Sequence, residues 1–138
     1  MGSAVVATTT ISLAFPVDEK LTPLRTAEGE NIFAYLPVTG AGLSFAINAD
    51  FELVASRQDV NDSHSGNHML LGRVPALFVH AILTDPVLGE SAFPTYLPDM
   101  DVVSRYQTGS GRKWFTLAHA LHRETEAWMI IPTEGGHR

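Results

Sequence analysis

The sequence predicts an α+β fold with two layers, in which two helices cover one face of a mainly antiparallel sheet. In the first half of the 138 residues, apolar and polar positions alternate as they do in half-buried strands. From residue 67 onward the apolar residues recur at three- and four-residue steps, which is the spacing of a helix. The content of hydrophobic residues is 45%, enough to fill a core. We therefore expect residues 1–138 to form a single domain.

A meander of three or four strands is expected in the first half. The first stops at Pro16, because proline cannot donate to a sheet. Gly40 and Gly42 predict a tight connection between the second strand and the third. A polar bend then leads into the fourth strand, which begins at Phe51. The expected strands are residues 6–15, 31–38, 43–47 and 51–55.

Apolar residues at four-residue steps predict an amphipathic helix over residues 67–83. Ser65 or Asn67 can cap its start. Pro75 falls inside this pattern, which predicts either a kink or a later beginning of the helix. The run 84–86, Thr-Asp-Pro, should end it.

The last third is expected to hold three short elements. Residues 93–97 lie beside two prolines and are typical of a short edge strand. The glycine-rich residues 108–112 predict a flexible break before a second helix, in which Trp114 and Leu121 share one face. Residues 127–131 are interpreted as a final strand.

Composition excludes several kinds of partner. The 9 basic and 15 acidic residues give a net charge of −6, which opposes binding to nucleic acid. No stretch approaches the roughly 20 apolar residues of a spanning helix, so no membrane partner is expected. The absence of cysteine excludes a disulfide framework, a thiol nucleophile and a thiolate metal site. We therefore expect an intracellular protein, cytoplasmic or nuclear.

Arg57 is the main candidate functional residue. It stands where the apolar strand that begins at Phe51 breaks into a polar turn. Its guanidinium is a permanent cation with a bidentate fork of donors, so at a strand end it could reach a phosphate. The structural alternative is a surface ion pair with Asp59 or Asp62.

Four motifs follow one another in the first half of the chain, namely Phe33-Ala-Tyr-Leu-Pro37, Gly42-Leu-Ser-Phe45, Asn48-Ala-Asp-Phe51 and Ala55-Ser-Arg-Gln-Asp-Val60. In their order and spacing these motifs resemble one family. They resemble the segment that follows the nucleotide-binding domain in sacsin and plant NO VEIN-type proteins, which are GHKL (histidine kinase and heat-shock-chaperone-like) ATPases. The resemblance covers residues 30–83, and residues 132–135 more weakly. It implies a transducer or middle domain, with the nucleotide-binding domain absent from this chain.

The resemblance also implies a role for Ser56, Arg57 and Gln58. This triplet is similar to Ser-Arg-Glu in the middle domain of the ninety-kilodalton heat-shock chaperone, where the arginine reaches the γ-phosphate of ATP. Arg57 would then be catalytic across a domain interface, and the triplet would contact the nucleotide. The chain lacks the Glu-Asn helix, the Asp-x-Gly-x-Gly turn and the Gly-rich lid of these ATPases. Alone it should be no enzyme, because ATP and magnesium require a separate nucleotide-binding domain as partner.

Two other function classes stay open. One is a stand-alone protein-interaction module, which would bind a client through a strand edge or an aromatic patch. The other is a histidine-dependent metal enzyme, suggested by the spacing of His64 with His68 and of His119 with His122. No His-Glu-x-x-His motif supports that spacing, so no metal ligand is assigned.

Overall fold

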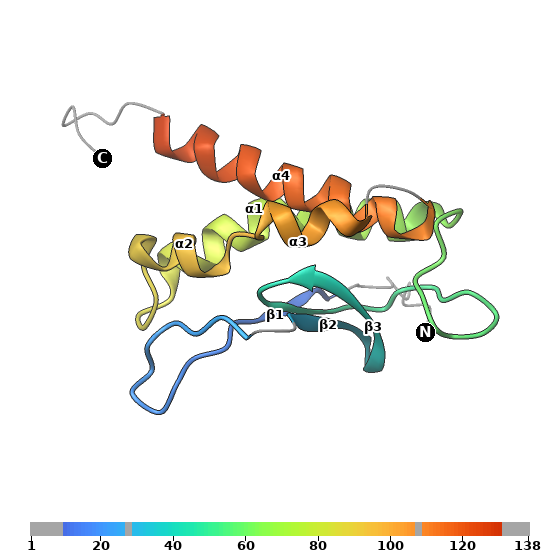
Figure 1. Cartoon of the computed structure of the whole chain (residues 1–138), viewed down its shortest axis with the longest axis horizontal. Helices are drawn as coiled ribbons and strands as arrows, with labels where there is room; N and C mark the ends of the chain where they lie inside the picture. Colours follow the sequence, from blue (N-terminus) through green and yellow to red (C-terminus); the bar gives the residue numbers. More distant parts are fainter. Residues whose placement is uncertain (1–9, 27–28, 107–108, 131–138) are drawn as a thin grey trace, which may run out of the picture.

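The structure, a computed structural model, describes residues 10–26, 29–106 and 109–130. Figure 1 shows two layers, with the helices packed on one side of a small sheet. The predicted two-layer α+β fold is therefore confirmed. Within the described residues, no helix combines the length and the hydropathy needed to cross a membrane.

The sheet has four strands in the order β1-β4-β2-β3. β1 pairs antiparallel with β4, and β2 pairs antiparallel with β3. β2 and β4 are parallel neighbours, so their carboxyl ends lie at the same end of the sheet. The chain therefore leaves both strands on one side of the molecule. The strands are β1 Ser12–Ala14, β2 Glu30–Ala34, β3 Leu36–Leu43 and β4 Ala46–Asn48.

The second strand was expected to run over residues 31–38, and this prediction is wrong. The chain reverses at Tyr35, which lies between β2 and β3 and has a φ of +68°. Gly40 and Gly42 lie inside β3 instead of forming a turn. Gly42 has a φ of +73°, next to a shift of the β2–β3 register. The glycines therefore serve a bulge in the strand.

The predicted strands at residues 6–15 and 51–55 also need correction. β1 is only three residues long, and residues 6–9 lie outside the described part. Residues 51–55 form no strand, and only an isolated bridge joins Leu53 to Val60. Phe51 is nevertheless buried, so the apolar alternation reflected packing of a loop against the core.

The first predicted helix is confirmed as α1, Ser65–Thr84. It includes Pro75, which is buried, and it begins slightly earlier than expected instead of later. His64 occupies the N-cap position without a side-chain hydrogen bond, and Asn67 does not cap the helix. The helix ends at Thr84, with Asp85 as its C-cap, within the run 84–86 that was expected to end it. The predicted apolar stripe is buried, namely Leu70, Val74, Phe78 and Ile82.

Helices replace both strands that were predicted in the last third. Residues Phe93–Tyr96 form the short helix α2, whose first turn contains a proline, a favourable position for that residue. The expected second helix is α4, Arg112–Ile130, and it continues through most of the predicted strand 127–131. Ile131 lies outside the described residues. The remaining short helices are η1 Glu90–Ala92, α3 Met100–Val103, η2 Ser104–Tyr106 and η3 Gly109–Gly111.

Aromatic rings join the two layers. The ring of Phe78 on α1 lies 5.0 Å from that of Phe45, measured between centroids, and Phe15 lies 5.0 Å from Tyr96. Trp114 of α4 is 1% exposed. Trp114, Phe93 and Tyr96 therefore belong to the core and are not available as an aromatic patch for a client.

Tyr96 ties α2 to the first half of the chain. Its hydroxyl donates to the carbonyl of Pro16. Burial raises the pKa of this phenol, and the Asp85 carboxylate adds to the effect, while a backbone hydrogen bond with Leu24 opposes it. The phenol of Tyr96 therefore loses its proton at a higher pH than an exposed tyrosine does.

Candidate functional site

Arg57 lies in a narrow loop of residues 52–61, which we name the Arg57 loop. Two backbone hydrogen bonds close its base, from Asn61 N to Glu52 O (2.9 Å) and from Val54 N to Asp59 O (3.0 Å). A tight turn forms its tip, where Arg57 N donates to Val54 O at 2.8 Å. Arg57 was expected at a strand end, but it stands at the tip of this closed loop.

The side chain of Arg57 is exposed, as are those of Ser56 and Gln58. Arg57 has a φ of +63°, a left-handed conformation that costs an L-residue roughly 1 to 2 kcal/mol. Within the described part of the chain, neither Asp59 nor Asp62 forms an ion pair with Arg57. The structural alternative of a local ion pair is therefore not what this loop adopts.

Asn67 of α1 holds the base of the loop. Its side-chain amide donates to Glu52 O (2.8 Å) and to Asn61 O (2.9 Å). Its Oδ1 accepts from Glu52 N at 2.9 Å. Asn67 is only 2% exposed, so these hydrogen bonds are shielded from water. The two sides of the loop are thereby fixed to the first turn of α1.

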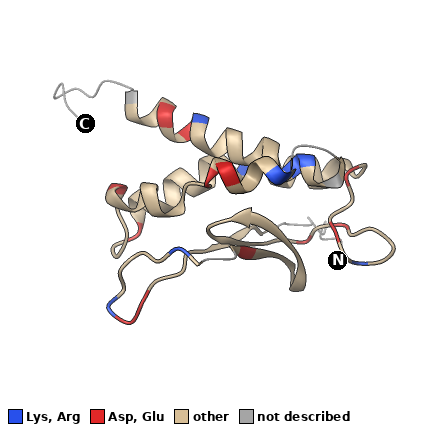
Figure 2. Ribbon diagram, in the orientation of Figure 1, with Lys and Arg blue, Asp and Glu red and all other residues tan. Residues whose placement is uncertain are grey.

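Lys113 of α4 holds the loop from the other helix. Its Nζ lies 3.3 Å from Asp59 Oδ2 and 2.7 Å from Asp62 Oδ1. The Lys113 side chain is 12% exposed, so the pair is partly shielded from solvent. Figure 2 shows basic residues at the beginning of α4, on the side of the molecule where the Arg57 loop lies. The two aspartates that could have neutralised Arg57 thus face a lysine instead.

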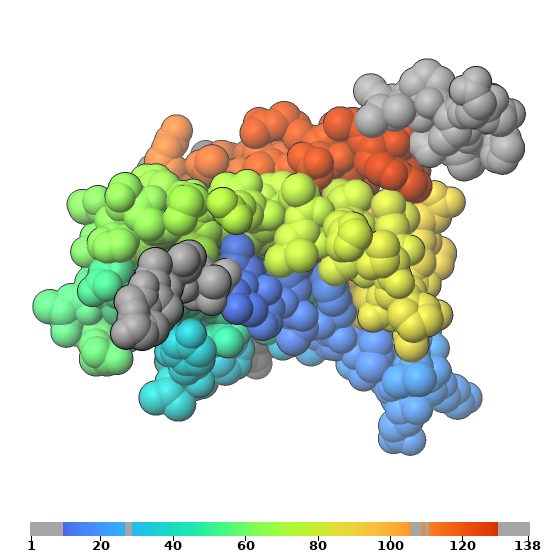
Figure 3. Space-filling view, turned by 180° about the vertical axis from the view of Figure 1, so that it is seen from behind, coloured from blue at the N-terminus to red at the C-terminus, as the bar shows by residue number. Residues whose placement is uncertain are grey.

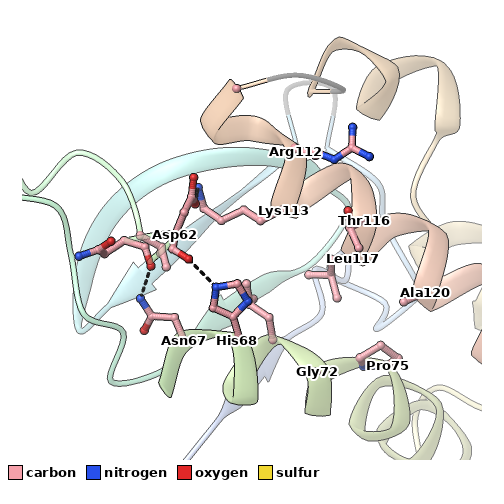
Figure 4. A pocket seen from close by; sticks show the side chains of 14 residues that line it. Asp62, Asn67, His68, Gly72, Pro75, Arg112, Lys113, Thr116, Leu117 and Ala120 are labelled. Carbon is pink, nitrogen blue, oxygen red and sulfur yellow. Dashed lines mark hydrogen bonds and ion pairs between the residues drawn. The ribbon is translucent and has the colours of Figure 1, made fainter. Parts of the chain in front are cut away.

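A cavity of about 460 Å³ lies behind the loop, between α1 and α4. Its walls include Leu71, Pro75 and Leu117, and a Cβ added at Gly72 would meet open space. Figure 4 shows the His68 ring directed toward the backbone of Asp62, whose carbonyl it contacts. Asn61 and Asn67, which form the base of the loop, also line this cavity.

The histidine pairs are not brought together as a metal site. Within the described residues, no group of three or more His, Cys, Asp or Glu side chains could hold a metal ion. His122 Nε2 lies 2.8 Å from Pro98 O, and the His119 ring packs edge-on against Phe115. His119 and His122 therefore each make a contact with another part of the helical layer.

Sequence reasoning missed both residues that hold the loop. Asn67 was considered only as a helix cap, and Lys113 was not singled out. Lys113 is 54 residues from Asp59, so no local pattern could have joined them. The one signal in the sequence is the position of Asn67, an asparagine at the start of the predicted helix and a few residues after the Arg57 loop.

Comparison with known proteins gives one informative relative. The chain is 42% identical to "Protein NO VEIN" of Arabidopsis thaliana over 161 aligned residues, which cover 94% of this chain. It spans only 6% of the length of that relative. No family model matches the sequence, and no solved structure matches the fold.

This similarity supports the NO VEIN-like resemblance read from the motifs. The sacsin and GHKL parts of that resemblance stay predictions. Over nearly its whole length, the chain is similar to one short stretch of the NO VEIN protein.

Proposed function

We propose that this chain is a transducer-like segment of a NO VEIN-type, chaperone-like ATPase. In this role Arg57 reaches the γ-phosphate of ATP held by a separate nucleotide-binding domain. The observation that carries the proposal is the outward-facing Arg57, on a loop tied to α1 by Asn67 and to α4 by Lys113. The similarity to NO VEIN supports the proposed parent class.

The physical reason is electrostatic. A guanidinium aimed at a transferring phosphoryl group stabilises the charge that develops in the transition state. Such arginines are worth roughly 10³- to 10⁵-fold in rate. Because the loop is already fixed by two helices, little reorganisation is needed when the phosphate arrives. Ser56 and Gln58 flank Arg57 and would add hydrogen bonds to the same nucleotide.

Asn67 and Lys113, the two clamps of the Arg57 loop, would also transmit the nucleotide state. A phosphate that pulls on Arg57 acts on a loop whose base is bonded to Asn67 and whose acidic residues are bonded to Lys113. Any displacement would therefore reach the first turns of α1 and α4. This chain contributes a cation and hydrogen-bonding groups, while the partner domain holds ATP and magnesium.

The direct test is Arg57→Ala in a longer protein that carries this segment beside a nucleotide-binding domain. We expect kcat for ATP hydrolysis to fall by about 10³-fold, with folding unchanged. Arg73→Ala is the matched control, because Arg73 is an exposed arginine on α1. Turnover that is unchanged by Arg57→Ala would exclude the proposal.

A second test addresses the division of labour. Isothermal titration of this chain with ATP and magnesium should give no binding heat. A micromolar affinity would mean that the chain has a nucleotide site of its own, which contradicts the proposed dependence on a partner domain.

A further inference from the structure

The tip of the β2–β3 hairpin carries two large exposed apolar side chains. Tyr35 is 71% exposed and Leu36 is 73% exposed, the highest values among the large exposed hydrophobic residues in the described part of the chain. They are neighbours in sequence, so together they form a small apolar projection. Neither contributes to the core.

The backbone at this tip is held in a costly conformation. Tyr35 has a φ of +68°, where glycine or asparagine would fit with less strain. The side chain of Asn48 maintains this turn by accepting a hydrogen bond from Tyr35 N at 2.8 Å. Strained residues of this kind concentrate at contact and functional sites. A tyrosine kept there at a cost points to a use for its exposed ring.

The topology places this tip at the same end of the sheet as the chain that leads into the Arg57 loop. β2 and β4 are parallel, so the hairpin tip after β2 and the chain after β4 leave the same end of the sheet. The chain after β4 leads directly into the Arg57 loop. Figures 1 and 3, seen from opposite sides, both show the hairpin tip and the Arg57 loop at one end of the molecule.

We infer that Tyr35 and Leu36 are the apolar anchors with which this chain docks on the nucleotide-binding domain that Arg57 addresses. The inference rests on the proposed function and names the contact that holds the two domains together. The ring of Tyr35 and the side chain of Leu36 enter an apolar recess of that domain, while Arg57 reaches the phosphate beside it. Exposed tyrosines that become fully desolvated commonly dominate the binding energy of an interface.

The tip of the β2–β3 hairpin therefore supplies the affinity for the partner domain, and the tip of the Arg57 loop supplies the acceleration of ATP hydrolysis. Loss of the anchors weakens docking, and turnover is restored when the partner domain is in excess. Loss of Arg57 leaves docking in place and removes the rate enhancement. These two patterns are separable because one changes Kd and the other changes kcat.

The test measures docking of the purified chain on the segment that precedes the matched region in Arabidopsis NO VEIN. Tyr35→Asn removes the ring and fits the left-handed backbone, so its melting temperature should be equal to or above that of the unchanged chain. We expect Tyr35→Asn and Leu36→Thr each to weaken binding by about tenfold or more. Leu21→Asn is the matched control, since Leu21 is 56% exposed with a φ of +63° in a loop at the other end.

Each other outcome has a defined meaning. Binding that is unchanged by both anchor variants, or absent for the unchanged chain, overturns the inference. Self-association that the Tyr35 variant abolishes also overturns it, because the anchors would then serve a second copy. Arg57→Ala should change Kd by less than about threefold. If the anchors act as inferred but Arg57→Ala leaves turnover intact, the docking surface stands and the proposed function fails.

Discussion

Two loops at opposite ends of the molecule each carry an arginine and use it in opposite ways. In the Arg25 loop, residues 16–26, Arg25 is also exposed, but its guanidinium turns back onto α2. It donates to three backbone carbonyls around α2, at 2.7 to 3.0 Å, those of Pro94, Thr95 and Leu97. In the Arg57 loop the guanidinium turns outward, and Asn67 and Lys113 hold the loop instead. The first arginine stabilises the fold, whereas we propose that the second serves a partner.

The difference shows how function can be read from hydrogen bonding. Both loops are closed by backbone bonds and tied to helices, so looseness does not explain the exposure of Arg57. A loop fixed by other residues, with its cation projecting, is organised to present that cation. The following predictions test whether the two ends really differ in this way.

The largest effect on the free energy of unfolding is expected from Asn67→Ala. It removes three hydrogen bonds and leaves Glu52 N without its acceptor, while Glu52 O and Asn61 O each keep one backbone donor. The free energy of unfolding should fall by about 3 kcal/mol. Chemical denaturation measures this loss, and amide exchange at Val54 and Arg57 should accelerate. Asn31→Ala, on the exposed side of β2, is the control, and an equal loss there would contradict a specific clamp.

The paired variants Arg25→Ala and Arg57→Ala test the comparison most simply. Arg25→Ala should lower the free energy of unfolding by about 1 to 2 kcal/mol, because three carbonyls lose a charged donor. Arg57→Ala should change it by less than about 0.5 kcal/mol. Thermal melts of the isolated chain distinguish the two. Equal losses would mean that Arg57 is structural after all.

The sequence predicted the fold class and α1 well, because periodic apolar residues such as Val74 and Phe78 decide which face is buried. It failed where tertiary packing overrode local signals. Gly40 and Gly42 resembled a turn, yet the reversal occurs at Tyr35, whose backbone N–H donates a hydrogen bond to the side chain of distant Asn48.

The candidate site was predictable only in part. Arg57 was identifiable from its place in the motif, but its clamps come from two helices that no local pattern connects to it. The strand predicted over residues 127–131 failed because residues up to Ile130 continue α4, where Trp128 packs 6.1 Å from Phe93. Such contacts become visible only in three dimensions.

A smaller effect is expected from Lys113→Met. The change keeps most of the aliphatic stem and removes the charge that pairs with Asp59 and Asp62. The free energy of unfolding should fall by about 1 kcal/mol, and less at high salt. The rate of amide hydrogen exchange in the Arg57 loop should rise, while the rate in the Arg25 loop stays unchanged. Salt-independent destabilisation would show that packing, not charge, is what Lys113 supplies.

The smallest effect concerns pH and the Arg25 end. Burial raises the pKa of Tyr96 above its ordinary value of 10.0, so the folded chain retains this proton longer than the unfolded chain. The stability contributed by the neutral phenol is complete below pH 10 and is lost as the pH rises through the folded pKa. Melting temperatures above pH 10 should fall more for the unchanged chain than for Tyr96→Phe. Parallel curves would contradict this assignment.

The most direct measurement of the central claim is reconstitution of ATP turnover in trans. The nucleotide-binding segment of a NO VEIN-type protein is mixed with increasing amounts of this chain, unchanged or carrying Arg57→Ala, with Arg25→Ala as the comparison in the other loop. We predict that the unchanged chain and the Arg25 variant accelerate ATP hydrolysis to the same saturating rate. The Arg57 variant should leave the rate of hydrolysis unaccelerated at every amount added. Full acceleration by the Arg57→Ala chain would contradict the account.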